Sequence, residues 1–220
     1  NATIFRNGSF EDNSPLKPQQ ANQIEGGVKL DILRNRLSLT ATYYDISVDN
    51  MSLSLSATDN AGTTRNYTVQ DGTQKSKGFE FDFTANPVEG LNVVLGYSHN
   101  DSKMTKASPT IEGRRPVSAG PEELVNFWLS YTVPSSVING LGAGFGGNYA
   151  SKNVITSTTT TGDFTLPAYT VLNASLFYNM NKFRIGLKMD NLTDKQYFKG
   201  WTTVEPQQPR SFLANISFKF

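Results

Sequence analysis

The 220-residue sequence contains no cysteine and only one histidine, His99. The absence of cysteine excludes disulfides and thiolate metal sites. Twenty basic side chains against nineteen acidic ones leave a net charge of +1, and so near-neutral a balance gives no indication of nucleic-acid binding. No apolar run approaches the roughly 20 residues that a membrane-spanning helix needs, which excludes helical spans.

What the sequence has instead is alternation with a period of two residues. In the last nine residues, every second side chain is apolar, and the chain ends on an aromatic residue. The residues on this apolar face are Phe212, Ala214, Ile216, Phe218 and Phe220. Such a strand is typical of the end of an outer-membrane β-barrel, whose strands face lipid on one side and the lumen on the other. We predict that Phe220, Phe218 and Ile216 form its membrane-insertion signal.

The same period recurs in nine segments, and none of them has a helical period. They are 24–32, 37–44, 79–85, 91–98, 125–131, 141–149, 172–178, 183–190 and 212–220. Short turns and long polar links connect them in strict alternation. The turns lie near 34–36, 86–90, 134–139 and 179–182, and the links near 50–77, 100–123, 150–167 and 199–210. Alternation of this kind is expected of an outer-membrane barrel, which has short turns at one end and long loops at the other.

Side-chain chemistry favours a membrane barrel over a soluble sandwich. Tyrosines near the ends of the apolar stripes suit interfacial girdles: Tyr43, Tyr97, Tyr131, Tyr149 and Tyr178. The opposite face carries charges that a hydrated lumen tolerates and a dry core does not: Glu25, Lys29, Asp31, Glu80, Asp82, Arg184, Lys188 and Asp190. The predicted fold class is therefore all-β, an antiparallel transmembrane β-barrel.

Nine antiparallel strands cannot close on themselves, because the first and last would run parallel. Either Ala2–Arg6 is the tail of a tenth strand, or further strands lie upstream. Asn1 looks like an internal start, without an initiator Met or a signal peptide, so we expect a longer protein. A small self-contained barrel with a structural or adhesive role is the alternative.

Several segments resemble TonB-dependent outer-membrane receptors of the siderophore type. They are Ile24-Glu-Gly-Gly-Val-Lys29 with Ala41-Thr-Tyr-Tyr-Asp-Ile46, Ser76-Lys-Gly-Phe-Glu-Phe81, Gly90-Leu-Asn-Val-Val-Leu-Gly-Tyr97, and Pro121 leading into Asn126-Phe-Trp-Leu-Ser-Tyr131. The most specific is Asp190-Asn-Leu-Thr-Asp-Lys-Gln-Tyr197, which is similar to the family's penultimate-strand motif.

This resemblance implies that residues 1–220 are the carboxy-terminal part of a barrel of about 22 strands, without the plug domain and earlier strands. It implies active uptake of a ferric siderophore or similar metal chelate, with the chelate as transported ligand and no intrinsic cofactor or enzyme activity. The implied partners are the TonB-ExbB-ExbD complex, outer-membrane lipid, lipopolysaccharide and the barrel-assembly machinery, in the outer membrane of a Gram-negative bacterium.

For a chelate with a flat face, we expect aromatic and cationic contacts from the long links. The candidates are Tyr67, Arg114, Arg115, Phe198 and Trp201, with loop packing and lipopolysaccharide contact as the alternative role.

Other motifs carry less chemistry. Gly142–Gly147 matches G-x-G-x-x-G without a following helix, so we interpret its glycines as room for something inside the barrel. A barrel hydrolase centred on His99 is a third hypothesis, although Ser98 and His99 fall on opposite faces of one strand. Asp45, Asp49 and Asp59 do not form a calcium-loop pattern, so no metal site is predicted.

Overall fold

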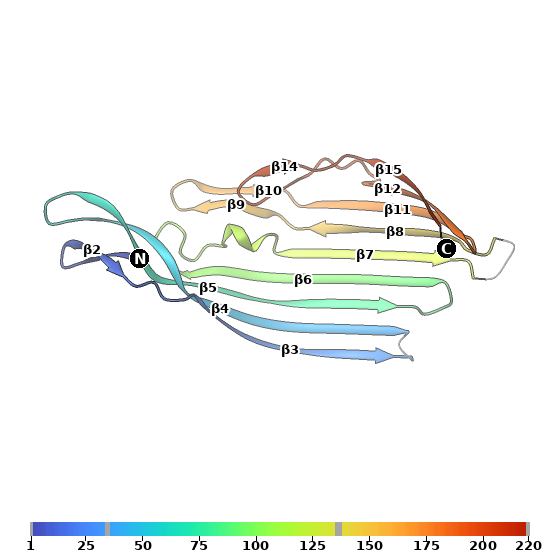
Figure 1. Ribbon diagram of the computed structural model, residues 1–220, viewed down its shortest axis with the longest axis horizontal. Helices are drawn as coiled ribbons and strands as arrows, with labels where there is room; N and C mark the ends of the chain where they lie inside the picture. The colour runs from blue at the N-terminus through green and yellow to red at the C-terminus, as the bar shows by residue number, and fades with distance from the viewer. Residues whose placement is uncertain (1, 34–35, 135–137, 219–220) are drawn as a thin grey trace.

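A computed structural model describes residues 2–33, 36–134 and 138–218, and its main element is one broad antiparallel sheet (Figure 1). Nine strands pair in the order β15-β12-β11-β8-β7-β6-β5-β4-β3. Their bounds are β3 Gln20–Ile32, β4 Leu37–Thr58, β5 Thr64–Ala85, β6 Leu91–Lys106, β7 Glu123–Thr132, β8 Leu141–Ala150, β11 Tyr169–Asn179, β12 Phe183–Asp190 and β15 Ser211–Phe218. All nine strands that the alternation predicts are therefore present in one sheet, and β3 and β15 form its edges.

The register keeps two chemically different faces across the whole sheet. One row of directly paired residues runs Leu30, Leu39, Phe83, Leu95 and Phe127, and other rows on that side are also mainly apolar. Because side chains alternate along a strand, most charged and amide residues of the central part of the sheet lie on the opposite side. Toward the hairpin end the first side also becomes charged, in the row Asp45, Lys77 and Asp101. We call these sides the apolar face and the polar face.

No segment of the described residues forms a layer against the apolar face. Leu187, Leu129 and Phe145, which belong to interior strands, are 54%, 45% and 41% exposed. Exposed apolar surface on this scale marks contact with another molecule or with lipid. Among the described residues, no helix is long and apolar enough to cross a membrane.

The two ends of the sheet differ, but the long links are more ordered than expected. The short turns lie at one end, on the right of Figure 1, and the long connections at the other, which we call the hairpin end. The predicted loop at 50–77 is mostly strand, because β4 and β5 continue to a tight turn at 59–63. The predicted loop at 150–167 contains the hairpin β9 (Asn153–Thr158) and β10 (Gly162–Leu166).

The remaining two links also contain regular structure. The link at 100–123 includes the end of β6 and a short 3-10 helix, η1 (Val117–Ala119). The link at 199–210 holds the hairpin β13 (Phe198–Gly200) and β14 (Val204–Pro206). Parts of the predicted turns at 34–36 and 134–139, and Phe220, lie outside the described residues.

Ala2–Arg6 is not a strand of the main sheet, which corrects one of the two expectations for this segment. It forms β1, which within the described residues pairs with β2 (Ser9–Ser14) alone, in a separate hairpin. This hairpin packs against β5 at the hairpin end, where the Asn60 amide donates to the Gly8 carbonyl at 3.0 Å. A ten-strand ring closed by Ala2–Arg6 is therefore wrong.

Glycines on the polar face of β8 are covered by large side chains of neighbouring strands. A Cβ on Gly144 would lie 2.5 Å from Trp128 Cζ2, and one on Gly142 would clash with the Phe177 ring. Aromatic rings that lie across glycines in a sheet fill the space that the missing side chains leave. Gly142, Gly144 and Gly146 thus leave room for aromatic rings on the polar face, and these rings belong to the sheet itself.

We predict that Gly144→Ala destabilises the native protein by about 1–3 kcal/mol, because Trp128 must leave its position. The measurement is unfolding by guanidinium in detergent micelles. The matched control is the double variant Gly144→Ala with Trp128→Leu, in which the smaller side chain relieves the clash. The effect of Gly144→Ala on the free energy of unfolding is thus measured twice, once with Trp128 present and once with Leu at that position. Equal effects in the two backgrounds would show that the two residues do not interact.

The Asp59 carboxylate holds the β4–β5 turn together. Backbone N–H groups of Thr63 and Ala61 donate to Asp59 Oδ1 at 2.8 and 3.0 Å, and Arg65 lies 3.3 Å from Oδ2. The hydrogen bond from the Thr63 amide is the main reason why the pKa of Asp59 lies below its usual 3.8. Arg65 and the Ala61 amide lower this pKa further, whereas desolvation raises it.

An acidic group whose pKa is lower in the folded than in the unfolded protein stabilises the fold at any pH above its unfolded-state pKa. This stabilisation is lost as the pH falls through the folded-state pKa. We therefore expect the Ala61 and Thr63 amides to keep their protection from hydrogen exchange down to about pH 4 and to lose it below, after correction for intrinsic rates. Asp59→Asn should abolish this acid transition. Loss of protection already between pH 7 and 5 would contradict the assignment.

Candidate functional site on the polar face

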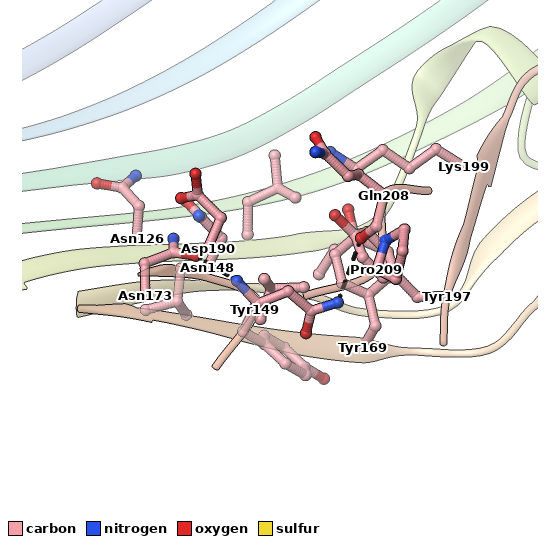
Figure 2. Close-up of a pocket in the computed structure, with 15 residues that line it drawn as sticks. Asn126, Asn148, Tyr149, Tyr169, Asn173, Asp190, Tyr197, Lys199, Gln208 and Pro209 are labelled. Carbon is pink, nitrogen blue, oxygen red and sulfur yellow. Dashed lines mark hydrogen bonds between the residues drawn. The ribbon is translucent and has the colours of Figure 1, made fainter. Parts of the chain in front are cut away.

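Three asparagines from three strands meet on the polar face, near the hairpin end. Asn126 of β7 pairs directly with Asn148 of β8, and Asn173 of β11 pairs with Gly146, one step diagonally from Asn148. They line a cavity of about 470 Å³, shown in Figure 2. Among the described residues, no hydrogen bond is recorded for the side chains of Asn126 or Asn148, so both amides are free to bind a ligand.

The loop after β12 forms one side of this cavity and is fixed by Asn191. This side chain is only 2% exposed; its Nδ2 donates to the carbonyls of Lys195 and Gln208, and its Oδ1 accepts from the Lys195 amide. Asn191 has a φ of 53°, a left-handed conformation that asparagine tolerates. The Asp190–Tyr197 motif therefore has a structural role here: it holds the following loop against the sheet.

Lys199, Tyr169 and Tyr197 form a cationic and aromatic rim. The two tyrosine rings lie 4.5 Å apart between centroids, and Lys199 Nζ lies 5.8 Å from the Tyr169 centroid and 5.9 Å from that of Tyr197. Figure 2 shows the lysine side chain reaching over the cavity toward Gln208. A cation near two ring faces is held in place electrostatically while its charge stays available.

A second cavity of about 290 Å³ adjoins the first and shares Leu124, Tyr169 and Lys199 with it. Its wall includes Asn153, whose Nδ2 donates to the Gly200 carbonyl at 2.9 Å. The Oδ1 atom of Asn153 is buried and has no hydrogen-bond partner among the described residues. A buried acceptor without a donor is costly, so this atom is a local cost of packing the two hairpins together and not an accessible ligand contact.

The five predicted ligand residues do not converge on one cavity. Phe198 lines the second cavity and is 46% exposed, whereas Trp201 and Arg115 line a separate cavity of about 230 Å³ with Met51 and Met104. Tyr67 packs in an aromatic cluster with Phe5 and Phe10, each at 5.9 Å between centroids. The ligand-binding role of all five stays a prediction.

The two arginines of the predicted set hold loops in place. Arg114 Nη1 donates to Ser157 Oγ at 2.9 Å and to Asp163 Oδ1 at 2.7 Å, which joins the β6–β7 connection to the β9–β10 hairpin. Arg115 donates to the Asn100 carbonyl and side chain and to the carbonyls of Gly120 and Pro121. Burial lowers the pKa of Arg115, which Glu122 and Asp101 counteract.

His99 lies away from the cavities, on the apolar face. Its ring stacks on Phe79 at 5.4 Å, and its nitrogens lie 3.9 Å from Glu122 and Glu123. Ser98 is on the opposite face of the same strand, so the two residues do not form a catalytic pair.

Sequence reasoning did not select the asparagines, Lys199 or the tyrosine pair as a site. Asn126, Asn148 and Asn173 were visible as polar positions of three strands, but only the register brings them together. The sequence feature that could have indicated this site is an asparagine at a matching position in each of three strands.

We predict that Arg115→Lys loosens the 107–122 segment, because lysine cannot replace the forked contacts of the guanidinium. The measurement is limited proteolysis of the native protein, with several-fold faster cleavage in this segment and an unchanged barrel core. Arg6→Lys, at an exposed position of β1, is the control. Equal cleavage of all three proteins would exclude the role.

Comparisons with known proteins agree with this architecture. Residues 2–192 match the family model described as TonB dependent receptor-like, beta-barrel. The ferrioxamine B receptor of Salmonella typhimurium LT2 is 28% identical over 229 residues, which covers all of this chain and 31% of the relative. The metal-pseudopaline receptor CntO of Pseudomonas aeruginosa PAO1 is 26% identical, over 92% of this chain and 28% of the relative.

Among solved structures, the closed form of the ferric-catecholate import receptor Fiu from Escherichia coli K12 matches with a TM-score of 0.76 and 23% identity, over 96% of this chain and 30% of that one. This likeness concerns the fold. The chain spans about three-tenths of the length of these relatives. Because the family model matches most of its residues, the chain belongs to the TonB-dependent receptor β-barrel family, whose members are outer-membrane β-barrels.

Proposed function

We propose that this chain is the carboxy-terminal barrel part of an active transporter for a ferric siderophore or similar metal chelate in the outer membrane of a Gram-negative bacterium. The observation that carries the proposal is the cavity of about 470 Å³ on the polar face, with its free amides and its lysine. In a barrel of this family the polar face lines the lumen, so this cavity lies on the transport route. The relatives are receptors, two of them for ferrioxamine B and metal-pseudopaline.

The proposal extends to the whole receptor. Residues 1–220 form one barrel segment, with earlier strands and a plug domain elsewhere in a barrel of about 22 strands. The unpaired outer edges of β3 and β15 support it, because a membrane barrel leaves no strand edge in lipid. The relatives' greater length supports it as well.

The partners follow from this assignment. The TonB-ExbB-ExbD complex supplies energy through the plug region, and lipid with lipopolysaccharide surrounds the apolar face. The barrel-assembly machinery recognises the terminal strand, with Ile216, Phe218 and Phe220 as its signal. Ile216 and Phe218 are 62% and 67% exposed on the apolar face, which supports this role.

The test is transport by the native protein in its own outer membrane. We expect an intact mass about three times the 24.2 kDa of this chain, binding of a ferric chelate, and labelled-iron uptake that stops when TonB is deleted. Binding should survive that deletion, because it needs no energy. A native chain near 24 kDa, or iron uptake that is independent of TonB, would overturn the proposal.

A further inference from the structure

We infer that the cavity with the three asparagines selects ferric chelates that carry net negative charge and an aromatic arm, such as catecholates, over uncharged hydroxamate chelates. This inference rests on the proposed function and names the substrate class of the same site.

The charge in the cavity carries the first step. Of its described lining residues, Lys199 is the only cation and Asp190 the only carboxylate. Asp190 is already paired, because Lys188 Nζ lies 2.8 Å from its Oδ1. For Lys199, no ion pair or hydrogen bond of the ammonium group is recorded among the described residues, and the group faces two tyrosine rings. Glu205 is the direct partner of Lys199 across the β13–β14 hairpin but forms no ion pair with it, so the ammonium group stays available to a ligand at the cavity.

The aromatic preference comes from the adjoining cavity. Its walls are mostly apolar or flat, with contributions from Pro121, Leu124, Leu166, Pro167 and Phe198. Walls of this kind suit the face of a ring. Since both cavities share Lys199, a ring in the smaller one places its oxygens beside the ammonium group.

The polar atoms complete the match. The free amides of Asn126 and Asn148 can donate to oxygens of the chelate. A hydroxamate chelate without charge or ring would use the amides but neither Lys199 nor the apolar walls.

The test measures binding of two complexes to the native receptor: an anionic ferric tricatecholate and an uncharged ferric trihydroxamate. We expect tighter binding of the tricatecholate, weakening as salt rises. Lys199→Gln should weaken tricatecholate binding roughly tenfold and leave trihydroxamate binding unchanged. Lys199→Arg should keep most of the affinity, and Lys182→Gln, in the turn at the opposite end of the sheet, is the matched control.

The outcomes separate the two proposals. A native receptor that binds neither complex, and takes up no other ferric chelate through TonB, contradicts the proposed function. A receptor that binds chelates but prefers the trihydroxamate, or whose tricatecholate affinity is the same in Lys199→Gln, overturns only this inference. Mobility of the folded protein on unheated gels confirms that each variant folds.

Discussion

The feature on which the whole structure depends is the unbroken register of nine antiparallel strands. Because side chains alternate, a slip of one residue at any strand would move its apolar row to the polar side. The pairs Ile185–Ile216 and Val28–Ala41, at opposite ends of the sheet, belong to the same apolar face. Irregularities in the main sheet occur only beyond this region, where β4 and β5 extend past Val48 and Gln74 toward their turn.

The same register determines the shape of the polar face. Successive glycines in β8 allow Trp128 and Phe177 to lie across the sheet, and Arg184 then stacks on Phe177 at 4.3 Å. Toward the hairpin end, β8 carries Asn148 instead of glycine, and the large rings give way to amides. The polar face thus changes along one strand from a filled wall to a cavity with free hydrogen-bonding groups. Position along the strand, more than any single residue, decides where a ligand can enter.

Sequence patterns were sufficient for the nine strands and their two faces, because each strand repeats one simple period over seven or more residues. They were insufficient beyond the apolar stripe. In the extension of β4 toward its turn, Leu53, Leu55 and Ala57 alternate with Ser52, Ser54 and Ser56, but the short run lies within a long polar stretch that was interpreted as a loop. The segment is a strand because β4 pairs with β5 there and because Leu53 packs against Met104, and the sequence alone shows neither contact.

The candidate site was harder to predict for a related reason. Arg114 and Arg115 were chosen as free cations, yet the hydrogen bonds of Arg115 to Asn100, Gly120 and Pro121 commit that side chain to the loop. Lys199, only one residue from the predicted Phe198, lines the cavity and forms no ion pair in the described part of the chain, although Glu205 lies opposite it in the β13–β14 hairpin. Which charge is compensated depends on where carbonyls and carboxylates of distant segments lie. A sequence reveals the number of charges, whereas only the fold reveals which of them is left for a ligand.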